Sequence, residues 1–160
     1  MPINSARATI TRPANATQYA AGDVIASAQA DTLRFSSYSS GTVTIRGAMC
    51  VTSANQAAKP DIDLYLFTST LTTFGSDNGA FTPTDAEMLT CCGFISFPGT
   101  GFKAGDATVG ATGNAVCQVT GLEIAVPVGG GHAIYGVPVA QSAYTPITGE
   151  VINFVLHLET

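Results

Sequence analysis

Short runs that alternate apolar and polar residues recur along almost the whole chain, separated by Gly, Pro, Ser and Asn. In the run TLRFSS, Leu33 and Phe35 alternate with polar neighbours, and in VINFVLHL the same period places Ile152 and Phe154 on one side. A period of two is typical of a β-strand with one buried face. Such alternating runs, together with apolar runs of strand length, cover residues 7–11, 32–37, 42–53, 61–68, 91–97, 115–127, 132–140 and 151–158.

These runs predict an all-β fold, because the chain carries no amphipathic pattern long enough for a substantial helix. About eight short strands, each with one face to bury, are best satisfied by two antiparallel sheets packed face to face. We therefore predict an antiparallel β-sandwich of jelly-roll type. With 160 residues the chain is long enough for one domain with a sizeable core. Residues 1–160 are interpreted as that single domain, with residues 1–30 as a candidate extended contact segment at the amino end.

Two connections, roughly residues 69–89 and 98–114, are longer than a sandwich needs. Connections of that length are usually functional or locally structured. In the first of them, Thr82-Pro83-Thr84-Asp85 predicts a short helical turn near residues 82–89. Thr82 would be the N-cap residue and Pro83 would occupy the first helical position.

The stretch SDNGAFTPTDAEM (76–88) crowds several carboxylates and carboxamides together, which raises the question of a metal site. A calcium loop of the EF-hand type needs oxygen ligands at alternate positions and a Glu at the twelfth. Counted from Asp77, the third, fifth and twelfth positions are Gly79, Phe81 and Met88, so this motif is not met. We interpret the stretch as turn and cap residues, with Phe81 as the apolar anchor of the loop, and predict neither a metal nor a cofactor.

No catalytic constellation is apparent in the remaining sequence. Asp61 and Asp63 share one strand face, which is interpreted as a solvated face that resists edge pairing. His132 and His157 are the two histidines, and no Ser or Cys lies in a nucleophile-elbow pattern. The run 129–131 is three glycines without the Lys-Ser/Thr ending of a phosphate loop, so it predicts a hinge or a turn. We expect that the protein is not an enzyme.

The charge of the chain disfavours some classes of binding partner. Only 11% of the residues are charged, against about 25% in average soluble proteins. The net charge is −5 and the basic residues are scattered, which disfavours nucleic acid as a partner. The opening residues do not resemble a signal peptide and no stretch is apolar enough for a membrane helix, so synthesis in a cytoplasm and no membrane partner are expected.

The four cysteines form no paired zinc-ligand spacing and are predicted to be free, mostly buried thiols: Cys50, Cys91, Cys92 and Cys117.

The segment NATQYAA near the amino end is bracketed by Arg12-Pro13 and Gly22-Asp23. Pro13 holds its neighbour extended, and Gly22 has the character of a turn residue. Two interpretations stay open. The segment is either an arm that docks on a partner or a surface turn anchored by Tyr19 in the core.

Several phrases together resemble small virion proteins of tailed bacteriophages. They are ITRPANATQYAAGDVIA (10–26), LYLFTS (64–69), SDNGAFTPTDAEM (76–88) with GFISF (93–97), and IYGVPVAQSAYTPITGEVINFVLHL (134–158). Their order is that of an R-P…Y-x-x-G-D opening, an L-x-L-F strand, a D-N-x-x-F segment, a Gly-aromatic strand and a Tyr-Thr-Pro near the last strand. The resemblance extends over most of the chain.

The resemblance implies a capsid decoration, or cement, protein: a β-sandwich that binds the outside of an icosahedral shell built by the major capsid protein. It implies a location on the virion surface after synthesis in the host bacterial cytoplasm. Repetition of one chain around a lattice also favours a closed homo-oligomer, and we expect a trimer rather than a dimer. The alternative is a carbohydrate- or receptor-binding module of a tail, baseplate or head fibre, since jelly rolls also serve as lectins. Candidate protein-contact positions are Arg12, Pro13, Tyr19, Asp23, Phe74, Asp77, Asn78 and Phe81.

Overall fold

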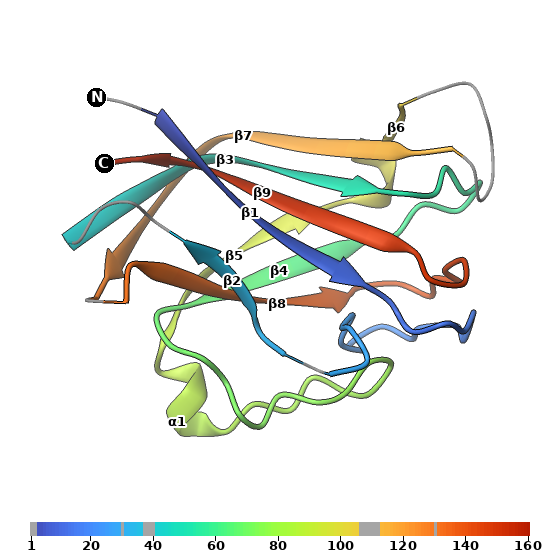
Figure 1. The fold of residues 1–160 in the computed structure, drawn as a ribbon, viewed down its shortest axis with the longest axis horizontal. Helices are drawn as coiled ribbons and strands as arrows, with labels where there is room; N and C mark the ends of the chain where they lie inside the picture. Colours follow the sequence, from blue (N-terminus) through green and yellow to red (C-terminus); the bar gives the residue numbers. More distant parts are fainter. Residues whose placement is uncertain (1–2, 30, 37–40, 106–112, 130) are drawn as a thin grey trace.

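The computed structural model describes residues 3–29, 31–36, 41–105, 113–129 and 131–160. These parts hold the following strands, in chain order (Figure 1): β1 (Ile3–Thr11), β2 (Leu33–Ser36), β3 (Gly41–Thr52), β4 (Ile62–Phe67), β5 (Cys91–Phe97), β6 (Lys103–Ala104), β7 (Ala115–Val128), β8 (Ala133–Ala140) and β9 (Val151–Glu159). Helix α1 spans Asp85–Met88, and a 3-10 turn spans Gly99–Gly101. Each predicted run overlaps one strand, and β1 begins four residues before its predicted run. The two-residue β6 is an addition that the sequence pattern does not predict; it lies in the second long connection.

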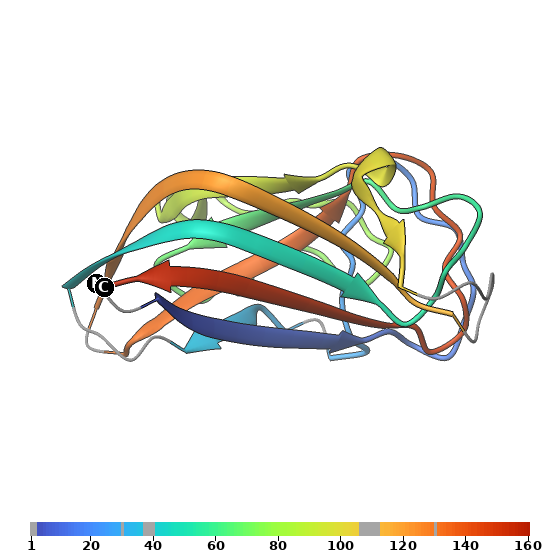
Figure 2. The ribbon, with the colours of Figure 1, turned by 90° about the horizontal axis from the view of Figure 1, so that it is seen from above.

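The strands form two antiparallel sheets with the orders β1-β9-β3-β7-β6 and β2-β8-β4-β5. Figure 2 shows the two layers from above. Most connections between successive strands cross from one sheet to the other, while β4–β5 and β6–β7 stay within one sheet. This connectivity is that of a jelly roll, so the predicted fold class is confirmed. The pairing of Ile3 with Glu159 brings the two ends of the described chain together.

The main core lies between the sheets and follows from the alternating pattern of the strands. Val43 and Ile45 of β3 are fully buried, as are Leu64 of β4 and Phe154 of β9. Burying a side chain of this size contributes about 1.5–3 kcal/mol. A β-bulge after Ile45 shifts the register of β3 against both neighbouring strands.

The bulge also changes which residues of β3 face the core. Before it, the odd-numbered Val43 and Ile45 point inward; after it, the even-numbered Ala48 and Cys50 do so. One extra residue on the bulged strand moves every later side chain to the opposite face. The bulge thus allows one twelve-residue strand to keep apolar residues in the core along both of its halves.

A second, smaller core covers the outer face of the four-stranded sheet. Phe67 of β4 and Val137 of β8 point away from the main core and pack with apolar side chains of the long connection and of the amino-terminal segment: Val24, Ala26, Leu71 and Phe74. Figure 1 shows these blue and green segments beneath β8 and β4. The first long connection therefore folds back over its own sandwich.

Helix α1 starts two residues later than the sequence pattern predicts. Its N-cap is Thr84, whose hydroxyl accepts from Glu87 N at 3.2 Å, while Glu87 Oε2 accepts from Thr84 N at 2.9 Å. This reciprocal capping box satisfies two backbone donors. The predicted N-cap at Thr82 is wrong, because the Thr82 N–H donates to the carbonyl of Phe74 at 3.3 Å and so belongs to the loop before the helix.

The amino-terminal segment lies against the sandwich along its described length. Before the start of β2, residues 22–25 run along the same edge of β8 as β2 does: Ile25 N donates to Pro138 O at 2.9 Å and Gly22 N donates to Ala140 O at 2.8 Å. Tyr19 is buried. The segment is therefore folded onto its own chain rather than extended, and its contact with a partner stays a prediction.

All four cysteines are free thiols, as predicted. Cys50 and Cys117 face each other across β3 and β7 and are buried. Cys91 and Cys92 are half-buried and point to opposite sides of β5, Cys92 against the main core and Cys91 against the second core. No helix among the described residues is long and apolar enough to cross a membrane.

Candidate functional site

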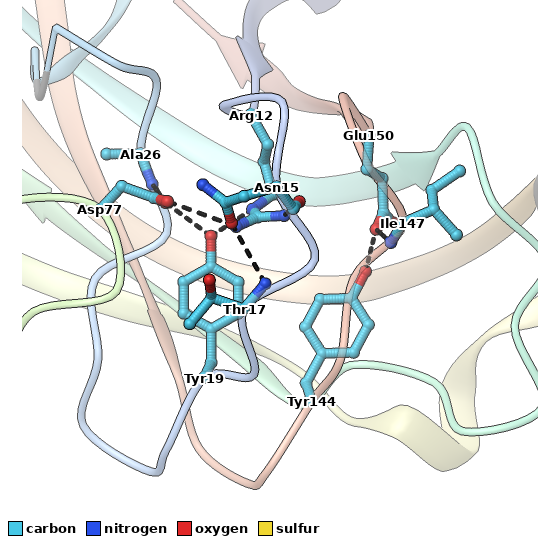
Figure 3. Close-up of polar contacts among 9 residues, drawn as sticks. All are labelled: Arg12, Asn15, Thr17, Tyr19, Ala26, Asp77, Tyr144, Ile147 and Glu150. Atoms are coloured by element: carbon cyan, nitrogen blue, oxygen red, sulfur yellow. Dashed lines mark hydrogen bonds and ion pairs between the residues drawn. The ribbon is translucent and has the colours of Figure 1, made fainter.

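Three segments that are far apart in the sequence meet towards the end of the sandwich opposite the chain termini: residues 12–26, the turn at 76–79 of the first long connection, and residues 141–150 (Figures 1 and 3). A backbone bridge joins the first to the third, with Tyr19 N donating to Tyr144 O at 2.9 Å. Side chains of these segments, together with Gln56 from the connection between β3 and β4, form a largely buried polar cluster. We refer to Arg12, Gln56, Asp77, Glu150 and the two tyrosines as the polar cluster.

Asp77 is the centre of one half of the polar cluster. Its carboxylate accepts from the Tyr19 hydroxyl at 2.5 Å, from Ala26 N at 3.0 Å and from Arg12 Nη2 at 3.3 Å. Arg12 Nε also donates to the Tyr19 hydroxyl oxygen. The Arg12 side chain has no solvent exposure and that of Asp77 is 10% exposed. A guanidinium removed from water needs a counter-charge, and Asp77 supplies it.

Glu150 is the centre of the other half. Its Oε2 accepts from the Tyr144 hydroxyl, from Gln56 Nε2 at 3.2 Å and from Ile147 N at 3.3 Å. Glu150 is only 1% exposed, and its Oε1 has no hydrogen-bond partner among the described residues. Burial raises the pKa of Glu150 above its usual value, because removal from water disfavours the ionised carboxylate.

Tyr19 and Tyr144 connect the two halves. Their rings are stacked, with centroids 6.0 Å apart and an angle of 5° between the ring planes. Burial raises the pKa of both hydroxyls, so both tyrosines stay protonated and act as hydrogen-bond donors to the carboxylates. A protonated, buried phenol is a poor nucleophile. The arrangement is suited to holding three chain segments together rather than to covalent chemistry.

The acidic stretch 76–88 is occupied by protein donors rather than arranged around a metal. Glu87 Oε1 accepts from Thr72 N at 2.6 Å and from Thr73 N at 3.0 Å, in addition to the helix cap made by Oε2. Hydrogen bonds from the Thr84 and Thr72 backbone lower the pKa of Glu87 to about 2. Among the described residues, no group of three or more His, Cys, Asp or Glu side chains could hold a metal ion.

The eight predicted contact positions converge on this region, although several are inaccessible. Arg12, Tyr19 and Phe74 are buried within the chain. The other five are half-buried: Pro13, Asp23, Asp77, Asn78 and Phe81. The three buried side chains hold the surrounding loops in place but are not themselves exposed to a partner. Contact between these positions and a partner stays a prediction.

Asp23 and Asn78 stabilise the turns of the same region. Asp23 Oδ2 accepts from Ala20 N at 2.6 Å. Asn78 has a φ of 58°, a left-handed conformation that Asn tolerates better than most residues, and its side-chain amide is placed to donate to Asp23 and to the carbonyl of Gln18. The turn predicted within residues 76–88 is formed here, with Gly79 N donating to Ser76 O at 3.0 Å.

The remaining polar residues singled out in the sequence have structural partners. Asp61 accepts from Gly99 N, and Asp63 accepts from the Ser96 hydroxyl at 2.6 Å. Both carboxylates are half-buried, so the face is less solvated than predicted. The predicted turn at residues 129–131 is formed in its described part, where His132 N donates to Gly129 O at 2.9 Å; Gly130 lies outside the described residues.

Sequence reasoning missed the half of the cluster around Glu150. A single Glu before a predicted strand carries no local signal that it will be buried. Its partner Gln56 lies 94 positions away in sequence, and the contact with Tyr144, six positions away, depends on the path of the loop before β9. The low content of charged residues was the one signal for Glu150, since in such a chain each carboxylate is a stronger candidate for a structural role than usual.

Comparison with known proteins adds no assignment. No family model matches this chain, and no curated protein matches it. The similarity of its phrases to phage virion proteins therefore stays a prediction from the sequence.

Proposed function

We propose that this chain is a non-enzymatic structural protein of a tailed-phage virion, which binds the outside of the capsid and stabilises the shell. The observation that carries the proposal is the fixing of its amino-terminal segment and long connection by the polar cluster around Asp77. Contact segments that are ordered before binding lose little conformational freedom in the complex. Such segments suit a protein whose role is to hold neighbouring shell subunits in place.

The architecture supports the same role. A jelly roll provides a rigid scaffold of two packed sheets, and a chain with few charged residues suits packing against other protein. In this proposal the partner is the major capsid protein, and each copy contributes an interface of ordinary size, about 800 Å² per partner. Repetition over many copies adds avidity, and a homotrimer provides it most simply.

The test compares phage heads assembled with and without this chain. We expect heads that lack it to release their DNA at a lower temperature, and purified protein added back to restore the original temperature. Mass spectrometry of purified virions should find the chain in many copies. If the chain is absent from purified virions, or if its removal leaves the release temperature unchanged, the proposal is wrong.

A further inference from the structure

A row of aromatic rings lies on the outer face of the four-stranded sheet. The rings of Phe81 and Tyr65 have centroids 5.1 Å apart, and those of Tyr65 and Phe94 are 5.7 Å apart. Tyr65 on β4 pairs with Phe94 on β5, and the neighbouring pair Leu64 and Ile95 points into the main core. Because successive side chains of a strand alternate between faces, Tyr65 and Phe94 point outward.

The far end of this row is open to solvent. Phe94 is 55% exposed, and Met88 and Leu89, close before it in sequence, are 38% and 87% exposed. These three are the exposed large apolar side chains of the described residues. Single exposed apolar residues need no explanation, but these three fall within seven consecutive positions, and Phe94 among them packs against the ring of Tyr65. We refer to Tyr65, Phe81, Met88, Leu89 and Phe94 as the aromatic face.

The chain segments that carry the aromatic face bear one sign of charge, and the basic residue on the same outer face, Arg34 of β2, lies two strands away from β4 and donates to Gly131 O at 3.1 Å. Residues 60–102 contain no Lys or Arg, and they contain five carboxylates: Asp61, Asp63, Asp77, Asp85 and Glu87. Asp77 is paired with Arg12, whereas the other four have no ion pair with a described basic residue. Asp63 lies two residues from Tyr65 on the same strand face, and Asp85 opens the helix that ends at Met88.

An exposed aromatic ring beside carboxylates favours one class of binding partner over the others. Two copies joined through this face by a two-fold axis would bring carboxylates opposite carboxylates, which costs free energy. A nucleic acid would be repelled by the same charges. A glycan needs several free hydrogen-bonding groups around a ring, whereas Phe94, the exposed ring of the face, carries none and the nearby Asp63 carboxylate already accepts from Ser96 at 2.6 Å. A protein surface with basic residues around an apolar side chain matches both the rings and the charges.

We propose that the aromatic face is a docking surface for a protein partner that presents an apolar side chain flanked by Lys or Arg. The inference rests on the proposed function and names its contact: the partner surface would belong to the capsid shell. Phe94 is the central anchor, since large aromatic side chains dominate the affinity of most interfaces. The half-buried Tyr65 behind it supports the Phe94 ring.

The experiment measures binding of the purified full-length protein to phage heads assembled without it, by co-sedimentation at several salt concentrations. The variant Phe94→Thr removes the ring and keeps a residue that favours strands, while Phe94→Tyr keeps the ring. Val51→Thr is the matched control, because Val51 is a half-buried apolar residue on the outer face of the other sheet. Circular dichroism during heating checks that each variant is folded.

We expect Phe94→Thr to weaken binding about 30-fold or more, as truncation of an interface anchor does. Phe94→Tyr and Val51→Thr should bind like the wild type. Asp85→Asn should reduce the salt dependence of binding, because it removes one of the charges that attract the basic partner. Wild-type binding that persists in a folded Phe94→Thr overturns the docking surface and leaves the proposed function standing.

Two further outcomes would overturn the proposed docking surface. Failure of the wild type to bind heads overturns both proposals. Binding of the protein to a glycan array, with loss of that binding in Phe94→Thr, would assign the aromatic face to a carbohydrate and overturn the protein partner.

Discussion

Replacing Asp77 by Ala tests whether the polar cluster holds the loop end of the sandwich together. The substitution removes an acceptor for Tyr19, Ala26 and Arg12 and leaves the Arg12 guanidinium without its counter-charge. Because the Arg12 side chain has no solvent exposure, the loss resembles that of one partner in a buried ion pair, about 3–5 kcal/mol. Domains are typically stable by about 5–15 kcal/mol, so Asp77→Ala should remove a large part of the total.

The assay is urea unfolding followed by circular dichroism, with thermal unfolding as a second measure. At about 2–4 °C per kcal/mol for a chain of this size, the midpoint should fall by roughly 6–20 °C. Asp85→Ala is the control, since Asp85 is an exposed acid in the first turn of α1 and should cost about 0.3–1 kcal/mol. The milder Asp77→Asn keeps the shape of the side chain in case Asp77→Ala does not fold.

A double-mutant cycle separates the charge pair from the packing. In Arg12→Met/Asp77→Ala the buried charge is absent, so the loss should be smaller than the sum of the two single losses. If Asp77→Ala costs less than about 1 kcal/mol, the value typical of an exposed pair, then the cluster does not hold the segments together. Strictly additive losses would contradict the pairing of Arg12 with Asp77.

Three further predictions address other parts of the fold. Ionised Glu87 stabilises the native state fully above its usual pKa of 4.5, and the stability difference from Glu87→Gln should vanish as the pH falls towards 2, the native pKa; a pH-independent difference in urea unfolding would contradict this. Gly75→Ala should cost on the order of 1–3 kcal/mol, since Gly75 has a φ of +107° and a methyl would lie 2.5 Å from a backbone oxygen, whereas Gly129→Ala meets open space. Burial raises the pKa of Cys50 and Cys117, so neither should react with a thiol reagent at neutral pH until the protein unfolds; rapid labelling of the native protein would contradict their placement.

The strands of this fold could be predicted because their signal is local. The alternation of Leu33 and Phe35, or of Ile152 and Phe154, gives both the strand and its buried face without knowledge of any partner. The bulge after Ile45 could not be predicted in this way, because it depends on the register that two neighbouring strands impose.

The start of helix α1 was predicted wrongly because two nearby residues carry almost equal N-cap signals. Thr82 and Thr84 both precede an acidic residue by three positions, and Pro83 suggests the earlier start. Thr82 is withdrawn from the helix by its backbone bond to Phe74, a contact eight residues away that the local pattern does not contain. Thr84 then caps the helix with Glu87.

The contacts within the polar cluster could not be predicted from local sequence patterns. Arg12 and Asp77 are separated by 65 positions, and their pairing depends on the course of the chain beside β8. The sequence could mark both as candidate contact residues, but it could not show that they contact each other rather than a partner. Glu150 gave no local signal of burial, since its three hydrogen bonds depend on the path of the loop before β9 and on Gln56, 94 positions away.

Cryo-electron microscopy of the purified virion tests the central claim most directly. The account predicts repeated density on the outside of the shell that fits this jelly roll, with β4, β5 and the aromatic face turned towards a basic surface of the capsid protein. A well-resolved shell with no density for this chain would contradict the claim, and density in the tail or fibres alone would contradict it equally.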